Sequence, residues 1–396
     1  MSGIRINMKL GVLELNIKKM SACLLAGLTV IFSLPLGALA LSQDEIKAPS
    51  AVLMEAQTGK VLYEKNDHEK RACASITKVM TLLLVMEALD SGKIGLNDTV
   101  TASEHAASMG GSDIWLKPGE SMTVDDMLKA TVIASANDAA VALAEYVAGS
   151  EDEFVAQMNQ RAKELGMKDT VFKNVNGLDE DGHITSAYDI ALMSRELIKH
   201  RKIFDYTQTW MDSVRNGKTQ LVNTNKLLKS YKGITGLKTG TTGKAGSCIS
   251  ATAQRNGVSL IAVVLGSSTT KDRFHSAATL LNYGFANWSV VTPKVPPQAN
   301  APVAVENGME SEVEPNVNGN ENLLVPKGKG GNVKSKVSMN GAVRAPVKKD
   351  QVLGKITYSL NNEVLKETPI RAKKAVEPIS FSSAFLLLFR MLTMDP

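Results

Sequence analysis

The order of strand-like and helix-like segments is the feature that most restricts how this chain can fold. Residues 51–56 and 60–65 are rich in aliphatic side chains and are separated by a Gln-Thr-Gly turn, so they predict a β-hairpin. Several segments of residues 75–200 then show helical periodicity, and residues 234–266 return to three strand-like runs before a last helix at 273–283. Strands that enclose a helical middle predict an α+β domain built on an antiparallel sheet, with α/β as the alternative.

The composition changes near Thr292, where a second domain is expected to begin. Residues 294–322 are rich in Pro, Asn and Glu, and residues 333–372 contain short β-like runs divided by turn residues. We therefore predict a first domain over residues 41–291 and a small β-rich domain over residues 292–376.

Residues 1–40 have the pattern of a secretory signal peptide. Two lysines precede an apolar run over 20–36, and residues 38–40 read Ala-Leu-Ala, the small-x-small pattern of a cleavage site. A buried core helix is the alternative, but such a helix would need neither the preceding lysines nor the Ala-Leu-Ala cleavage pattern. We therefore expect an exported protein.

The last residues form a second apolar segment. Residues 381–394 read FSSAFLLLFRMLTM, which is shorter than the ~20 apolar residues of a transmembrane helix. An amphiphilic helix that lies in the membrane interface fits this length, and the alternative is a terminal helix docked on the protein's own core. We predict a membrane-anchoring segment over residues 377–396.

Charge and motif searches exclude several kinds of protein. The chain of 396 residues has 45 basic and 40 acidic side chains, a net charge of +5 that is spread along its length. It lacks the clustered basic stripe of a nucleic-acid-binding protein. None of the five histidines belongs to an HExxH pattern, and no P-loop or GxSxG motif occurs. We expect no metal, no cofactor and no nucleic-acid partner.

Three short motifs remain, and they occur in a fixed order within the first domain. They are Ser75-Ile76-Thr77-Lys78 at the start of a predicted helix, Ser135-Ala136-Asn137 at a turn into another, and Lys238-Thr239-Gly240 in a predicted strand. SxxK and SxN also occur elsewhere in the chain by chance, so neither is specific alone. The ordered set of three is a strong signal for one site.

The first motif suggests a nucleophile beside its base. Residues three apart share a face of a helix, which places the Lys78 amine next to the Ser75 hydroxyl. A serine needs a base, and a lysine can serve when burial and neighbouring cations lower its pKa. The alternative for each residue is structural: Ser75 as a helix cap, Lys78 as a solvated surface residue and Asn137 as an N-cap.

These motifs resemble those of the serine penicillin-recognising enzymes. More closely, the chain resembles the low-molecular-weight penicillin-binding proteins of peptidase family S11, which are D-alanyl-D-alanine carboxypeptidases. The resemblance extends over nearly all of the chain after Ala48, including AVLMEAQTGKVLYEKN, ASITKVMT, SANDAAVALAE, GLKTGTTGKAG and APVKKDQVLGKI. It implies a β-lactamase/transpeptidase-like catalytic domain with an antiparallel sheet and a helical lobe, followed by the β-rich domain and the amphiphilic helix.

The resemblance also implies an acyl-enzyme mechanism. Ser75 would attack the carbonyl between the two terminal D-alanines of a peptidoglycan stem peptide, with Lys78 as the general base. Ser135 would pass a proton to the leaving amine, and Asn137 would bind the substrate amide and position Lys78. β-Lactam antibiotics would be covalent inhibitors. The resemblance further implies action at the extracytoplasmic face of the bacterial cytoplasmic membrane, facing the cell wall.

The third motif is implied to bind the substrate. Lys238 would favour the basic form of the catalytic lysine and attract the terminal carboxylate, with the hydroxyls of Thr239 and Thr241 nearby. Gly240 would allow another backbone to approach closely. The backbone N–H groups of the nucleophile and of Thr241 would form the oxyanion hole. Arg273 is expected, from its position after the sheet, to help hold the carboxylate.

Two cysteines flank the motifs in sequence, Cys73 beside the first and Cys248 after the third. In an oxidising compartment they could form a disulfide, and buried free thiols are the alternative. Many relatives have proline where this chain has Cys73.

Three alternatives to the carboxypeptidase use similar residues. A class A β-lactamase needs a glutamate in an ExxLN loop, and no ExxLN occurs between Asn137 and Lys238. A DD-endopeptidase would use the same side chains on a different leaving group. A penicillin-binding scaffold without turnover would have no need for every reactive side chain to be present.

Overall fold

The computed structural model describes residues 41–319, 321–382, 384, 385 and 389. The predicted signal peptide, residues 1–40, lies outside these residues.

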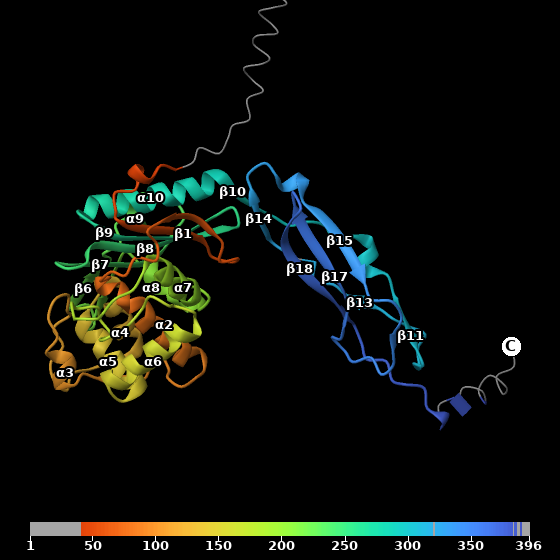
Figure 1. Ribbon diagram of the computed structural model, residues 1–396. Coiled ribbons are helices and arrows are strands. Elements are labelled where there is room, and N and C mark those ends of the chain that lie inside the picture. Colours follow the sequence, from red (N-terminus) through yellow and green to blue (C-terminus); the bar gives the residue numbers. More distant parts are fainter. Residues whose placement is uncertain (1–40, 320, 383, 386–388, 390–396) are drawn as a thin grey trace, which may run out of the picture. The chain divides into compact units, whose positions relative to one another are not determined.

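A central sheet of five antiparallel strands organises the first domain, in the order β2-β1-β9-β8-β7. The predicted antiparallel sheet is thus confirmed, with the early hairpin joined to the late strands through the β1–β9 pair (Figure 1). The strands are β1 (Ser50–Glu55), β2 (Val61–Lys65), β7 (Ile234–Thr242), β8 (Gly246–Arg255) and β9 (Val258–Ser267).

Helices cover both faces of this sheet. In Figure 1 α10 (Thr270–Asn287) lies along one face, and a helical lobe with α7 (Ala187–Leu197) lies on the other. All six residues of β1 are therefore buried, as expected for a strand covered on both sides. The helix α10 begins earlier than the predicted start at Arg273, because the Thr269 hydroxyl accepts a hydrogen bond from Asp272 N and caps it there.

The remaining elements of the domain are helices, most of them in the helical lobe, and two small two-stranded sheets. Thr123 caps α4, since its hydroxyl accepts a hydrogen bond from Asp126 N. The elements are η1 (Gln43–Glu45), η2 (Ala74–Thr77), α2 (Lys78–Asp90), β3 (Thr99–Thr101), α3 (Glu104–Ala107), β4 (Ser121–Thr123), α4 (Val124–Lys129), η3 (Ala130–Ala134), α5 (Asn137–Ala148), α6 (Glu151–Glu164), η4 (Arg201–Ile203), α8 (Phe204–Thr207), β5 (Met211–Val214), β6 (Thr219–Val222) and α9 (Leu227–Ser230).

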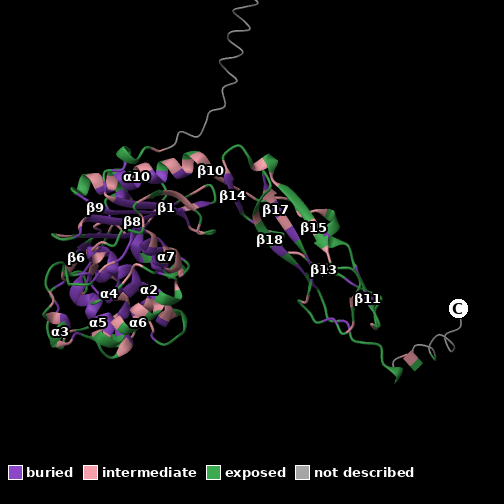
Figure 2. Cartoon of the chain, in the orientation of Figure 1, coloured by how far each residue is buried: buried purple, intermediate pink, exposed green. Residues whose placement is uncertain are grey.

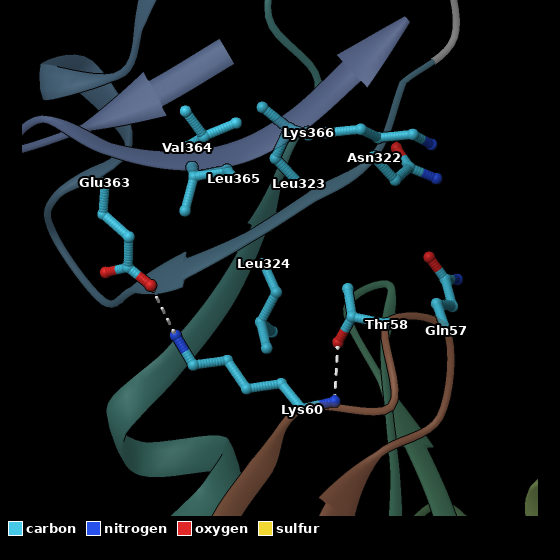
Figure 3. A pocket seen from close by; sticks show the side chains of 10 residues that line it. All are labelled: Gln57, Thr58, Lys60, Asn322, Leu323, Leu324, Glu363, Val364, Leu365 and Lys366. Atoms are coloured by element: carbon cyan, nitrogen blue, oxygen red, sulfur yellow. Dashed lines mark hydrogen bonds and ion pairs between the residues drawn. The ribbon is translucent and has the colours of Figure 1, made fainter. Parts of the chain in front are cut away.

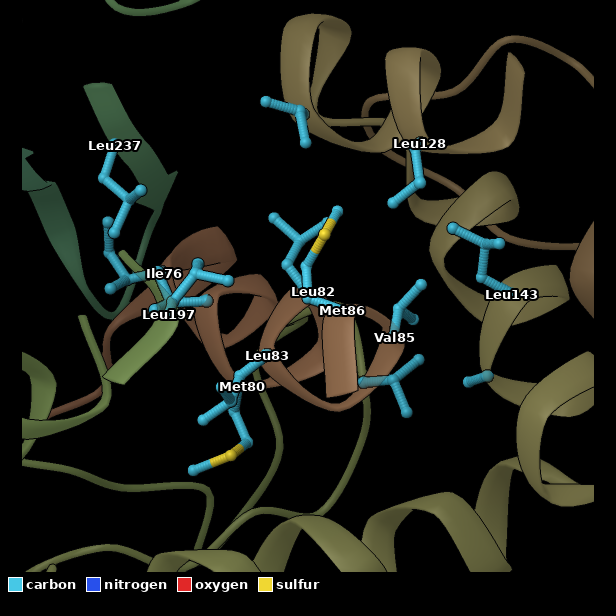
Figure 4. Packing of buried hydrophobic residues seen from close by; sticks show 14 of the residues in the cluster. Ile76, Met80, Leu82, Leu83, Val85, Met86, Leu128, Leu143, Leu197 and Leu237 are labelled. Atoms are coloured by element: carbon cyan, nitrogen blue, oxygen red, sulfur yellow. The ribbon is translucent and has the colours of Figure 1, made fainter. Parts of the chain in front are cut away.

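The helix α2 passes through the middle of this lobe. Its side chains are apolar in nearly every direction, so it can only be stable when it is buried on all sides. Figure 4 shows Met80, Leu82 and Met86 of α2 among residues of the surrounding elements, such as Leu128 and Leu197. The purple interior of the lobe in Figure 2 shows the same burial. The element that begins with the SxxK motif is therefore held rigidly by the core.

The predicted β-rich C-terminal part is confirmed as a set of small sheets. A four-stranded sheet has the order β13-β18-β17-β15, a three-stranded sheet has the order β12-β11-β16, and β10 pairs with β14. The elements are β10 (Trp288–Val291), η5 (Pro297–Asn300), β11 (Val303–Glu306), β12 (Glu312–Val313), β13 (Pro315–Asn316), β14 (Leu323–Pro326), η6 (Gly330–Asn332), β15 (Lys334–Met339), β16 (Val343–Arg344), β17 (Val352–Leu360) and β18 (Glu363–Ala372).

One pocket, drawn in Figure 3, is lined by the β1–β2 turn together with residues of β14 and β18. Lys60 and Glu363 face each other there, with 3.8 Å between the ammonium and a carboxylate oxygen. None of the three sequence motifs lines this pocket.

The predicted amphiphilic segment is described only in part. Phe381, Phe385 and Phe389 are exposed by 90%, 61% and 56%, and Ala384 N donates to Ser380 O as in a helical turn. None of the helices in the described part of the chain combines the length and the apolarity needed to cross a bilayer.

Candidate active site

The SxxK motif lies in a tight helical turn that leads directly into α2. Ala74 begins this turn with a φ of 50°, η2 contains Ser75, and α2 starts at Lys78. Lys78 Nζ lies 3.2 Å from Ser75 Oγ. The prediction that the two side chains share a face is confirmed, although the first turn is a 3₁₀ turn and not an α-helical one.

The Lys78 amine is fully buried and surrounded by neutral acceptors. It donates to Asn137 Oδ1 at 2.5 Å and to the backbone carbonyl of Asn176 at 2.8 Å. Burial, and then the nearby charge of Lys238, lower the pKa of Lys78 well below its usual value. A buried amine that loses its proton easily and touches a serine hydroxyl is suited to be a general base.

The SxN motif occupies an abrupt change of direction between η3 and α5. Ser135 has a left-handed backbone, with φ 62° and ψ 29°, which is uncommon for a residue other than glycine. This turn directs the Ser135 hydroxyl to Lys238 Nζ, 2.7 Å away. Asn137 opens α5, and its Nδ2 donates to the carbonyl of Gly110 at 2.6 Å while its Oδ1 accepts from Lys78. The motif therefore touches both of the other motifs.

The KTG motif lies in β7 at the edge of the sheet, beside the nucleophile. The Lys238 ammonium is buried and also donates to the carbonyl of Thr239 at 3.1 Å. Burial, and then the charge of Arg273, lower the pKa of Lys238 to about 7. The Thr239 hydroxyl donates to the hydroxyl of Thr224 at 2.7 Å.

Gly240 is required where β7 passes the nucleophile. A Cβ atom at this position would lie 2.8 Å from the carbonyl oxygen of Cys73 and 2.8 Å from the backbone nitrogen of Ser75. Such distances are too short for any side chain, which agrees with the predicted close approach of another backbone.

Arg273 reaches the same strand from α10. Its Nη1 donates to the Gly240 carbonyl at 2.9 Å and to the Thr241 hydroxyl at 2.8 Å. The residue is only 6% exposed, and its Nε has no hydrogen-bond partner among the residues that the structure describes. The structure thus places a buried positive charge beside the KTG motif.

Sequence reasoning missed the loop that closes the site from behind. Asn176 contributes only a backbone carbonyl, and a Cβ on Gly177 would lie 2.0 Å from the carbonyl oxygen of Ala74. Further along the loop, His183 Nε2 lies 2.7 Å from the Thr77 hydroxyl, within the SxxK turn. The Asn and Gly residues between 174 and 177 signal a turn, but no sequence pattern indicates what the turn touches.

Both cysteines are free thiols in the buried layer beneath the site, so the disulfide alternative does not apply to this structure. Burial raises the pKa of the Cys73 thiol to about 12. The two thiols are therefore protonated packing groups.

Residues 38–269 match the D-alanyl-D-alanine carboxypeptidase family, peptidase S11. The chain belongs to this family. The resemblance predicted from the motifs is confirmed. Residues 294–378 match the C-terminal domain of penicillin-binding protein 5.

Individual relatives agree over most of the chain. The D-alanyl-D-alanine carboxypeptidase DacF of Bacillus subtilis (strain 168) is 47% identical over 339 residues, which are 85% of this chain and 87% of the relative. Among solved structures, penicillin-binding protein 5 from Haemophilus influenzae is 29% identical with a TM-score of 0.73, over 85% of this chain and 100% of that one. Penicillin-binding protein D2 from Listeria monocytogenes, solved with ampicillin bound, is 33% identical with a TM-score of 0.56, over 61% of this chain and 98% of that one.

The family match and the similarity to solved structures establish the fold class of the chain. It has the mixed α and β fold of penicillin-binding proteins, followed by a β-rich C-terminal domain. The predicted domain boundaries and the roles of the individual site residues remain predictions.

Proposed function

We propose that this protein is a serine D-alanyl-D-alanine carboxypeptidase that removes the terminal D-alanine of peptidoglycan stem peptides through an acyl-enzyme on Ser75. The observation that most supports this is the pair of Ser75 and Lys78, 3.2 Å apart, in which the amine is buried and its pKa is lowered. A neutral Lys78 takes the proton of Ser75 as Oγ bonds to the carbonyl carbon. The family of the chain supports the choice of substrate.

The departure of D-alanine needs a proton at its nitrogen. The Ser135 hydroxyl accepts a hydrogen bond from Lys238 at 2.7 Å, and we assign to it the transfer of a proton to that nitrogen as the C–N bond breaks. Water then attacks the ester carbonyl, with Lys78 again as the base, and releases the shortened peptide together with the free Ser75 hydroxyl.

The negative charge on the carbonyl oxygen needs hydrogen-bond donors that are already in place. The contact of Gly240 with the backbone of Ser75 brings the next residue of β7, Thr241, close to the nucleophile. We assign the oxyanion hole to the backbone N–H groups of Ser75 and Thr241. In other enzymes, loss of one such donor costs about 3 kcal/mol of transition-state stabilisation.

The terminal carboxylate of the substrate is assigned to the positive end of the site. Lys238 and Arg273 are both buried there, and the hydroxyls of Thr239 and Thr241 lie on the same strand. The Nε of Arg273 lacks a partner among the described residues. A carboxylate would compensate these charges.

The activity is tested by incubating the protein with a stem pentapeptide and, separately, with labelled penicillin. We expect release of D-alanine and a persistent penicillin adduct, and both should be lost in Ser75→Ala. Ser268→Ala is the matched control, because Ser268 belongs to a second SxxK sequence that is exposed. Rapid turnover of penicillin would instead indicate a β-lactamase, and an adduct without release of D-alanine would indicate a scaffold or an endopeptidase.

We also propose that the protein is exported by residues 1–40 and held at the membrane by residues 377–396. Phe381, Phe385 and Phe389 are spaced by four residues, as on one face of a helix, and all three are exposed. Deletion of residues 378–396 should release the protein from sedimented membranes, and replacing the three phenylalanines with serine should do the same. If both variants still sediment with membranes, the anchor lies elsewhere.

A further inference from the structure

We propose that Trp115 is a specificity-determining residue, whose indole ring packs against the apolar surface of the peptide on the acyl side of the scissile bond. This inference rests on the proposed function. Its observations lie outside the three motifs, in the loop between α3 and β4.

The exposure of Trp115 is unusual for a large aromatic side chain. It is 80% exposed, whereas its neighbours Ile114 and Leu116 are 2% and 4% exposed. The loop thus turns its aliphatic side chains into the core and leaves its largest apolar side chain in solvent. Because most of its side chain stays in solvent, Trp115 contributes almost nothing to the stability of the folded domain.

The backbone at Trp115 is also strained. Its φ is 56°, in the left-handed region that favours glycine and is a marked outlier for a bulky residue. Such conformations persist only where the surrounding structure enforces them, and they gather at functional sites. A glycine at this position would relieve the strain and remove the exposed ring, so the fold alone gives no reason for tryptophan.

The charged side chains of Asp138, which is buried, and Arg215, which is half-buried, fix the loop on both sides of this residue. The backbone N–H groups of Ile114 and Leu116 donate to the carboxylate of Asp138 at 3.1 Å and 2.9 Å. The Arg215 guanidinium donates to the carbonyl of Ile114 at 2.7 Å and to that of Trp115 at 3.4 Å. The ring is therefore presented from a rigid support, which lowers the entropy lost on binding.

The same helix start holds the loop and the catalytic lysine. Asn137, directly before Asp138, binds Lys78 through Oδ1, and it donates to the carbonyls of Gly110 and Ser112 through Nδ2 and N, both at 2.6 Å. Asp138 therefore sets the position of the Trp115 ring, and its neighbour in the chain, Asn137, binds the catalytic lysine.

The orientation in which the substrate binds determines which part of it can reach the Trp115 ring. The terminal carboxylate is assigned to the end of the site formed by Lys238 and Arg273. The acyl part must leave Ser75 in the other direction, toward Asn137 and the loop of residues 110–116. Contact with Trp115 would then be made by the peptide beyond the two alanines that react.

The test compares two substrates of different length in the full-length protein. A stem pentapeptide can reach Trp115, whereas N-acetyl-D-alanyl-D-alanine contains only the reacting residues. We expect Trp115→Gly to lower kcat/KM for the pentapeptide about tenfold, and to change that for the short substrate by less than about twofold. Its thermal stability should be equal to that of the wild type or higher. Trp115→Phe should keep most of the activity on the pentapeptide.

A control and a second measurement separate this role from a structural one. Met211→Ala removes another apolar side chain of the lobe that is 53% exposed. This variant should leave kcat/KM unchanged for both substrates. In Ser75→Ala protein, titration with the pentapeptide should change the tryptophan fluorescence, and Ser75→Ala combined with Trp115→Phe should abolish that change. Equal losses on both substrates, or no loss on either, would overturn the inference. Failure of the wild type to release D-alanine from either substrate would instead overturn the proposed function.

Discussion

Replacement of Lys238 with methionine is expected to stabilise the fold while it removes activity. Burial and the charge of Arg273 lower the pKa of Lys238 from 10.5 to about 7. With about 1.4 kcal/mol for each tenfold change in the proton equilibrium, keeping this ammonium charged in the folded protein costs about 5 kcal/mol. Methionine has a similar length and no charge, so it removes this cost.

The pH dependence of the effect follows from the direction of the pKa change. The unfolded chain binds the Lys238 proton more tightly, so between pH 7 and pH 10.5 the unfolded state holds more protons and wild-type stability rises with pH. The full cost is present below pH 7 and falls to about 2 kcal/mol at pH 9. Methionine also leaves Ser135 Oγ and the Thr239 carbonyl without this donor, which costs about 1–3 kcal/mol at either pH. The variant should therefore be more stable by about 2–4 kcal/mol at pH 6 and about equal to the wild type at pH 9.

Urea unfolding at pH 6 and pH 9 measures this difference, together with D-alanine release and penicillin acylation at both pH values. Lys199→Met is the control, because this lysine is exposed on the same lobe, and it should change stability by less than about 0.5 kcal/mol. A Lys238→Met variant that is less stable than the wild type at pH 6, or a stability difference that is the same at both pH values, would refute the reasoning.

Three further predictions concern the surroundings of Ser75. Gly240→Ala should slow penicillin acylation by at least about a hundredfold, because the new Cβ would meet the Ser75 nitrogen at 2.8 Å and displace an oxyanion donor; unchanged acylation would contradict the assigned oxyanion hole. Thr77→Val should lower stability by about 1–3 kcal/mol in thermal unfolding, because the buried His183 Nε2, 2.7 Å away, loses its partner, whereas an unchanged Tm would show that the contact is dispensable. Cys73 should react with a thiol reagent far more slowly in native than in urea-unfolded protein, because burial raises its pKa to about 12; equal rates would show that the site opens readily.

The parts of the site that follow from local rules could be predicted from the sequence. The Ser75–Lys78 contact depends only on the spacing of side chains in a helical turn. The individual strands and the Thr123 cap depend on patterns within a few residues of each other. The apolar sequence of α2 also predicts its burial, although not which elements surround it.

The parts that depend on contacts between distant segments could not be predicted. The acceptor for Lys78 in the loop behind it is the backbone carbonyl of Asn176, and a backbone carbonyl is present at every residue. The left-handed turn at Ser135 is also invisible in sequence, because the residue has an ordinary side chain and is held there by the fold. The same holds for the exposed, strained Trp115.

The arrangement of charge in the site explains why the net charge of the chain says little about its substrate. Lys238 and Arg273 are both buried, and each donates to neutral oxygens of amides or hydroxyls, not to a carboxylate. The buried carboxylate of Asp138 accepts hydrogen bonds from backbone N–H groups of the loop before it. The fold therefore bears the cost of concentrated positive charge at one point, and this charge has two uses. Together with burial, which is the larger cause, it lowers the pKa of Lys78 so that the amine can act as a base. It also has no carboxylate as a hydrogen-bond partner among the described residues, so it is available to a substrate carboxylate. An inhibitor that keeps the reactive carbonyl but loses its carboxylate should therefore acylate Ser75 far more slowly than its parent.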